Sequence, residues 1–173
     1  HPFGTNIMNM FIRAGLALAL AAFSGAAAQA NTLTTSYASN NSNDGVMFDI
    51  TVGANDLTIT GFDLNLESAG ATIPLEFYIK TGSHVGFENT SGDWSLVDTG
   101  SVVSAGDDVA SYWDVSDYSL VAGGTYGIYL TALGSPNFNY FNGTAVGNVA
   151  AADGNLTIFE GTGKAYAFGG NFT

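Results

Sequence analysis

The sequence predicts an all-β protein: an antiparallel, jelly-roll-like β-sandwich of about eight to ten strands, preceded by a signal-peptide helix. Turn signals such as Asn43-Asp44-Gly45 and Ser91-Gly92-Asp93 recur at a spacing typical of sandwiches. Between the turns apolar residues alternate with polar ones, and no segment after Ala30 keeps a helical period. Such alternation is typical of antiparallel sheets with one covered face.

The alternation is clearest in three segments, which we expect to be strands. Apolar residues take every second position in 46–52, 73–80 and 125–131. Further strands are expected at 94–98, 100–104, 109–115, 137–141 and 156–160.

The run 57–66 also reads as a strand, but its apolar phase changes at Thr60-Gly61. Leu57 and Ile59 occupy odd positions, whereas Phe62 and Leu64 occupy even ones. A β-bulge at Gly61 would return both sets to one face. Alternatively, the strand changes sheets there, as it does at the corners of sandwiches.

The N-terminal segment has the order of a secretory signal peptide. Residues 8–13 carry one positive charge, 14–23 are apolar, and Ala28-Gln29-Ala30 is a small-x-small cleavage site. The apolar run is shorter than the roughly 20 residues that span a bilayer. We therefore expect cleavage after Ala30 and one mature domain over 31–173, without a membrane span, in the periplasm, on the cell surface or outside the cell. Residues 1–7 read as upstream sequence or a cloning scar.

The chain is strongly acidic, with a formal net charge of −12. All 15 Asp and Glu residues follow Ala30, where only Lys80 and Lys164 oppose them. Such a surface repels phosphate backbones and anionic lipid headgroups, so nucleic acid is not an expected partner. The chain has no cysteine, which excludes disulfides, a cysteine nucleophile and cysteine-based zinc or iron–sulfur sites.

Calcium is the cofactor that the acidic loops favour. Hard cations prefer oxygen ligands, and two turns supply them: Asn43 with Asp44, and Asp107 with Asp108. Neither turn has the spacing of an EF-hand, and Asx-Gly turns also form without a metal. A calcium site and a plain turn both stay open.

Aromatic and amide side chains suggest a carbohydrate site. Residues 137–142 combine Asn with Phe and Tyr. Tyr78 and Tyr129 lie on the polar faces of their expected strands, where either ring could be exposed. Aromatic rings can stack on sugars, but they also favour strands and cores. The candidate ligand-binding residues are Tyr78, Trp94, Tyr129, Asn139 and Tyr140, with polysaccharide as the ligand.

Hydrolytic chemistry has little support in the sequence. His84 is the only histidine after Ala30, and no Gly-x-Ser-x-Gly nucleophile elbow occurs. A carbohydrate-active enzyme would need two close carboxylates. Glu67, Glu76, Glu88 and Glu160 are available, but nothing in the sequence marks any of them. We expect no catalytic residues.

Four features in order resemble a group of secreted bacterial β-domains. They are the strand with Tyr78 and Lys80, the hairpin with Gly86-Phe87-Glu88 and Trp94, the start of a strand at 124–127, and the glycine-rich close at 161–170. Through these features nearly all of 31–173 resembles domains of PEP-CTERM-sorted and related surface-anchored proteins.

The resemblance implies a non-enzymatic sandwich on the cell surface or in the extracellular matrix, with a structural or adhesive role. Polysaccharide or other surface proteins would be its partners. A carbohydrate-binding module and a carbohydrate-active enzyme are the alternatives. Domains of this kind usually continue into one more strand and often a sorting tail, so we expect this chain to be truncated at its C-terminus.

Overall fold

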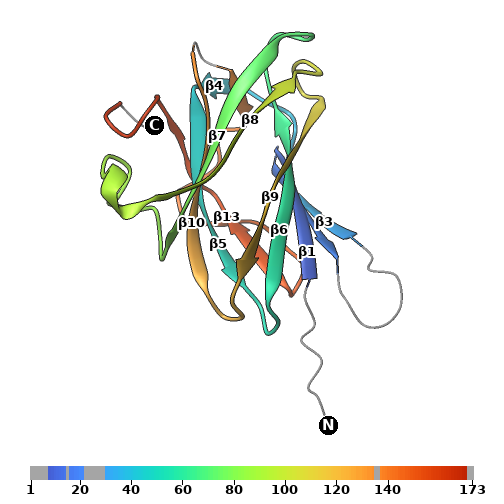
Figure 1. The fold of residues 1–173 in the computed structure, drawn as a ribbon, viewed down its shortest axis with the longest axis vertical. Coiled ribbons are helices and arrows are strands. Elements are labelled where there is room, and N and C mark those ends of the chain that lie inside the picture. The colour runs from blue at the N-terminus through green and yellow to red at the C-terminus, as the bar shows by residue number, and fades with distance from the viewer. Residues whose placement is uncertain (1–7, 15, 22–29, 135–136, 171–173) are drawn as a thin grey trace.

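The computed structural model describes residues 8–14, 16–21, 30–134 and 137–170, and they form an all-β fold consistent with a β-sandwich (Figure 1). These residues contain fourteen strands, more than expected, because several segments of three to five residues also pair. The helical structure among them is one 3-10 turn, η1 (Ser91–Asp93). No helix in this part of the chain is long and apolar enough to cross a membrane.

The larger sheet is built from antiparallel strand pairs in the order β12-β13-β5-β10-β7-β8, and β14 also pairs with β5. Its centre confirms the three most regular predicted strands. The members are β5 (Gly45–Val52), β7 (Thr72–Thr81), β8 (Ser95–Val103), β10 (Thr125–Ala132), β12 (Val149–Ala152), β13 (Leu156–Phe159) and β14 (Thr162–Lys164).

One element of this sheet corrects the sequence analysis. The two short strands expected at 94–98 and 100–104 are one continuous strand, β8. Gly100, where the second of them was expected to begin, lies under the Trp113 indole, and a Cβ there would stand 2.7 Å from Nε1 of that ring. The glycine therefore serves close packing between the sheets.

The second sheet has the order β1-β3-β2-β6-β9. It contains β1 (Met8–Ala14), β2 (Leu16–Ala21), β3 (Ala30–Thr34), β6 (Leu57–Asn65) and β9 (Ala110–Leu120); β4 (Asn41–Asn43) and β11 (Phe138–Tyr140) pair separately. The predicted bulge is present, since the β6–β9 register shifts between Ile59 and Gly61 while β6 stays in this sheet. Consequently Leu57, Ile59 and Phe62 are all fully buried.

The helix expected in the signal peptide is wrong for the residues that the structure describes there, which form β1 and β2. One edge of β6 pairs with β9, and the other takes β1 in parallel from Met8 opposite Leu57 to Arg13 opposite Asp63. The N–H and C=O groups along the open edge of β6 need hydrogen-bond partners. A strand supplies such partners, whereas a helix uses its own backbone groups internally. Ala28 of the predicted cleavage site lies outside the described residues, and Ala30 begins β3.

The main core fills the space between the sheets, and apolar residues from β5, β6, β7, β9, β10 and β13 form it. Phe62 and Phe77 meet edge to face at 4.9 Å across the interface. A smaller apolar cluster lies on the opposite face of the larger sheet and is built from Met47, Trp94, Tyr129 and Phe168. The larger sheet is therefore covered on both faces over part of its area.

Candidate functional site

The outer apolar cluster gathers three of the predicted carbohydrate-binding aromatics. Tyr78 and Tyr129 stack with ring centroids 5.7 Å apart, and Trp94 meets Tyr129 at 6.1 Å. Phe168, from the segment after β14, contacts all three rings at 5.1–5.9 Å.

Because Phe168 covers these rings, they do not form the exposed sugar-binding surface that the sequence predicted. Tyr129 is fully buried and Trp94 is 8% exposed, whereas Tyr78 is half-buried. The expectation that Tyr129 could be exposed is therefore wrong: the polar face of β10 is apolar here because a later segment folds over it. Aromatic packing of this kind stabilises a core and leaves the Tyr129 and Trp94 rings without an open face on which a sugar could stack.

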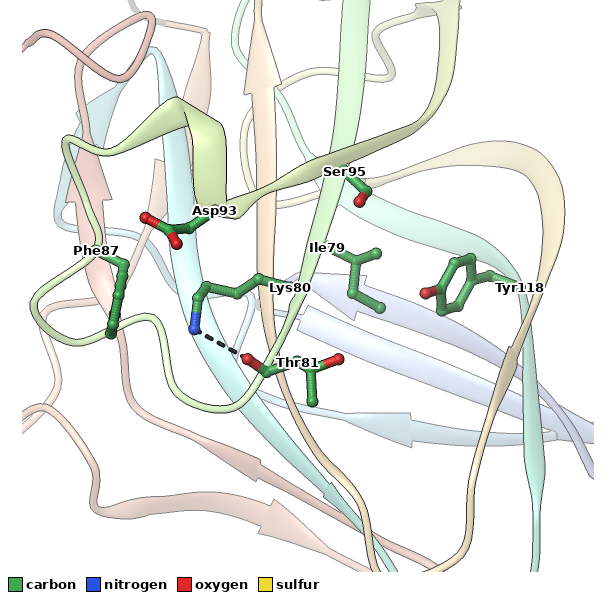
Figure 2. A pocket seen from close by; sticks show the side chains of 7 residues that line it. All are labelled: Ile79, Lys80, Thr81, Phe87, Asp93, Ser95 and Tyr118. Carbon is green, nitrogen blue, oxygen red and sulfur yellow. Dashed lines mark hydrogen bonds between the residues drawn. The ribbon is translucent and has the colours of Figure 1, made fainter.

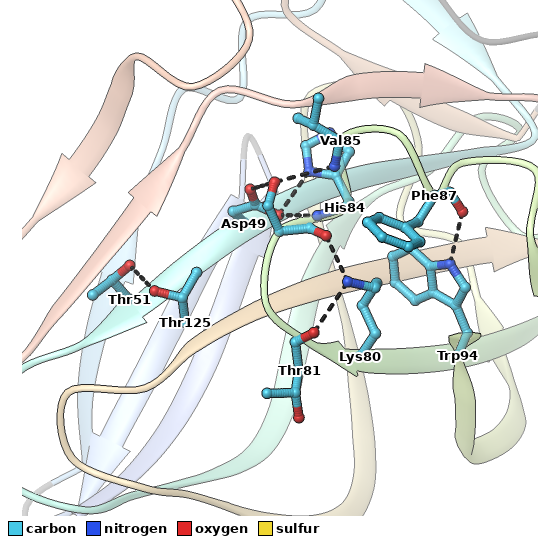
Figure 3. A network of polar contacts seen from close by, with 10 residues as sticks. Asp49, Thr51, Lys80, Thr81, His84, Val85, Phe87, Trp94 and Thr125 are labelled. Carbon is cyan, nitrogen blue, oxygen red and sulfur yellow. Dashed lines mark hydrogen bonds and ion pairs between the residues drawn. The ribbon is translucent and has the colours of Figure 1, made fainter.

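A loop over residues 82–94 lies beside this cluster and is held by buried polar groups (Figure 3). We call it the lysine loop, because Lys80 and Lys164, which lie outside it, both donate hydrogen bonds to it. The carboxylate of Asp49, on β5, accepts hydrogen bonds from the backbone N–H and Nδ1 of His84, both at 2.7 Å, and from Ser83 Oγ at 2.5 Å. Burial by itself raises the pKa of Asp49, but these hydrogen bonds outweigh it and hold the pKa below 3.8.

The same geometry differs from that of a serine hydrolase. In a catalytic triad the serine hydroxyl donates to the histidine nitrogen that faces away from the aspartate. Here Ser83 donates to the aspartate itself, and His84 Nε2 is buried without a hydrogen-bond partner among the described residues. Sequence analysis found His84 but not Asp49, because a pair 35 residues apart leaves no local signal.

Both lysines that follow Ala30 fasten this loop. Lys80 Nζ donates to the carbonyls of Thr81 and Ser83 at 3.0 and 2.7 Å and lies 4.1 Å from the centroid of the Phe87 ring. Lys164 Nζ donates to Asn89 Oδ1 at 2.9 Å and to the carbonyl of Gly170. Burial lowers the pKa of Lys164, partly offset by the negative charge of Glu88.

A small open pocket borders Lys80 at the end of the sheet where the pairing of β7 with β8 stops (Figure 2). Its volume is about 390 Å³, and Phe87, Asp93 and Tyr118 are among its walls. Figure 2 shows the Lys80 ammonium turned toward the Thr81 carbonyl. The one cation in its described lining is therefore already committed to the fold.

The larger cavity is a groove of about 490 Å³ beside residues 141–148, which we call the amide groove. Asn139 and Tyr140, predicted from sequence, line it together with Phe141 and Asn142, and Phe141 is 54% exposed. Its floor contains the buried core residues Phe48, Phe138 and Ile158. The segment 137–142 thus reaches the rim of a real cavity, unlike the aromatics on β7 and β10.

Glu160 is the one carboxylate among the described residues that line the amide groove. It accepts hydrogen bonds from the N–H groups of Thr144 and Ala145 at 2.7 and 2.9 Å and from Thr144 Oγ1 at 3.1 Å. These bonds lower its pKa, so the carboxylate stays ionised and holds the loop that borders the groove.

The predicted calcium ligands lie at two separate positions, Asp107 with Asp108 and Asn43 with Asp44. Asp108 accepts from the N–H and Oγ of Ser39, at 2.9 and 2.6 Å, and from Asn65 Nδ2 at 3.1 Å. Asp107 accepts from Asn139 Nδ2 at 3.0 Å. These carboxylates thus accept hydrogen bonds from neighbouring donors, as in a plain hydrogen-bonded junction.

The second predicted calcium turn is built differently. Asn43 Oδ1 accepts from the N–H of Asp44, whose carboxylate in turn accepts from the N–H of Tyr166. Within the described ranges no three His, Cys, Asp or Glu side chains cluster as a metal site would require.

Comparison with known proteins finds no matching family model, no matching curated protein and no matching solved structure.

Proposed function

We propose that this chain is an exported, non-enzymatic bacterial domain of the cell surface or extracellular matrix that adheres by binding carbohydrate in the amide groove. One observation carries the proposal: Asn139, Tyr140 and the exposed Phe141 line a cavity of about 490 Å³. That volume lies within the range of roughly 300–1,000 Å³ typical of small-molecule sites.

The chemistry of the groove suits a sugar better than an ionic ligand. Aromatic and aliphatic side chains can pack against the apolar face of a sugar ring, while amides of Asn139 and Asn142 exchange hydrogen bonds with its polar groups. The groove also borders the main sandwich core through Phe48 and Phe138, so its floor is rigidly positioned.

A carbohydrate-active enzyme is the weaker alternative. Glycoside hydrolysis requires two carboxyl groups that flank one bond. Glu160 already accepts three hydrogen bonds in the groove, and none of Glu67, Glu76 and Glu88 is among its described lining residues. The geometry therefore favours binding without bond cleavage.

Export and attachment rest on the sequence. The basic, apolar and small-residue order of 8–30 supports secretion, and the resemblance to PEP-CTERM-sorted and related domains supports a role at the surface or in the matrix. Strong negative charge argues against nucleic acid as the partner.

A glycan array probed with the full chain, in calcium and in EDTA, tests the proposal. We expect saturable binding to at least one polysaccharide class, and weaker binding for Phe141→Ala. The matched control is Leu96→Ala, which trims a similarly exposed apolar side chain on β8 outside the groove. Absence of binding by a folded chain, or equal losses in both variants, would remove the proposal.

A further inference from the structure

Resting on the proposed function, we infer that the amide groove recognises a neutral sugar with an acetamido substituent, an N-acetylhexosamine, in preference to plain hexoses and uronic acids. The inference rests on three properties of the lining: its charge, its exposed apolar wall and the unpaired amide groups at its rim.

The charge of the groove excludes acidic sugars. Glu160 is the charged side chain in its described lining, and its low pKa keeps it anionic. Lys80 and Lys164 do not line the groove; their ammonium groups donate hydrogen bonds to Ser83 and Asn89 of the lysine loop. A uronate carboxylate would enter an anionic site on an acidic protein without a counter-charge.

The apolar wall favours a methyl group over a hydroxyl. Phe141 and Val146 line the groove and are 54% and 51% exposed, so their apolar surface is open to a ligand. A hydroxyl directed at this surface would lose its water without gaining a hydrogen-bond partner. A methyl group would instead remove apolar surface from water.

The rim supplies one acceptor and one donor. Asn139 Nδ2 donates hydrogen bonds to Asp107 Oδ1 at 3.0 Å and to Asn65 Oδ1 at 3.5 Å. The Oδ1 atom of Asn139 is left without a partner among the described residues. Asn142 accepts through Oδ1 from Asn41 at 3.2 Å, which likewise leaves its Nδ2 unpaired within the described chain. An acetamido group has one N–H, one carbonyl and one methyl, which match the acceptor, the donor and the apolar wall.

Calorimetric titration of the full chain with three probes tests this inference. The probes are tetramers of N-acetylglucosamine, glucose and galacturonic acid. We expect the acetylated tetramer to bind at least about tenfold more tightly than the glucose tetramer, as one well-made hydrogen bond and a buried methyl imply, and the uronate not to bind. Asn142→Asp keeps the acceptor for Asn41 but replaces the free donor. It should weaken acetamido binding about tenfold and change glucose binding less than about twofold.

The outcomes separate the two proposals. Equal or tighter binding of glucose, binding of the uronate, or an unchanged acetamido affinity in Asn142→Asp would overturn the acetamido inference and leave carbohydrate binding standing. No binding to any probe or array glycan, by a chain with a cooperative melting transition, would overturn both. Leu96→Ala should match the unmodified chain with all three probes.

Discussion

The hydrogen bonds around Asp49 predict a large loss of stability for Asp49→Asn. The side chain is only 13% exposed and accepts three hydrogen bonds of 2.5–2.7 Å. The amide keeps one acceptor oxygen but loses the charge and places an N–H₂ group against one of the present donors. Because a hydrogen bond to a charged group contributes about 1.5–3 kcal/mol, we expect a loss of about 2–4 kcal/mol in the free energy of unfolding.

Thermal melting at neutral pH measures this effect. For a chain of this size, about 2–4 °C in Tm corresponds to each kcal/mol, so the Tm should fall by roughly 4–16 °C. Asp117→Asn is the matched control, because Asp117 is exposed on β9, away from the network around Asp49. Its Tm should stay within about 1–2 °C of the unmodified chain.

Acid adds a second, independent readout. The folded pKa of Asp49 lies below 3.8, so its charge stabilises the fold above that pH and the stabilisation is lost as the pH falls through the folded pKa. The difference between the unmodified chain and Asp49→Asn should therefore shrink below pH 3.8. A Tm for Asp49→Asn equal to that of Asp117→Asn, or a difference that grows in acid, would refute the assigned role of the carboxylate.

Three further variants or measurements follow from the packing and the sequence. Gly61→Ala should cost about 2–4 kcal/mol in urea denaturation, because its Cβ would lie 2.8 Å from the backbone oxygen of Trp113, whereas Gly92→Ala, with open space around it, should stay within about 1 kcal/mol of the unmodified chain. Phe168→Ala should cost about 3–5 kcal/mol and shift tryptophan fluorescence to the red, because it uncovers Trp94; an unshifted spectrum would contradict the outer cluster. When a bacterium exports the protein, its intact mass should equal that of a chain that begins at Asn31; an exported protein that retains residue 8 would contradict the cleavage site.

Cleavage after Ala30 would have a structural consequence for the second sheet. It would remove β1 and β2, which occupy the edge of β6 opposite β9. Unpaired strand edges recruit other strands, so hydrogen exchange along β6 should be faster in a chain that begins at Asn31 than in the precursor. Equal protection of β6 in both would mean that another segment takes this edge.

The strands of the sandwich were accessible to sequence reasoning because period-two alternation is a local property. It placed β5, β7 and β10 correctly and marked the irregularity near Gly61, where the structure decided for a bulge over a change of sheet. It divided β8 into two strands on either side of Thr99, and it missed β1 and β2, where an apolar segment supplies partners to an open edge.

The candidate site was accessible only in part. The Asn and aromatic composition of 137–142 marked one rim of the amide groove, but Glu160 and the floor residues come from other strands and leave no shared local pattern. The pairing of Asp49 with His84 is equally invisible, because it joins β5 to a loop that follows β7.

The sequence by itself determined the all-β class, the positions of the regular strands, the acidic charge and the export pattern, because each depends on residue type and near-neighbour order. Only the tertiary structure decided which aromatics are exposed. Tyr129 was a predicted ligand-binding residue and Phe141 was not, yet Phe168 covers the Tyr129 ring, whereas the Phe141 ring stays 54% exposed at a groove. Exposure depends on what the rest of the chain folds over, and that is a property of distant contacts.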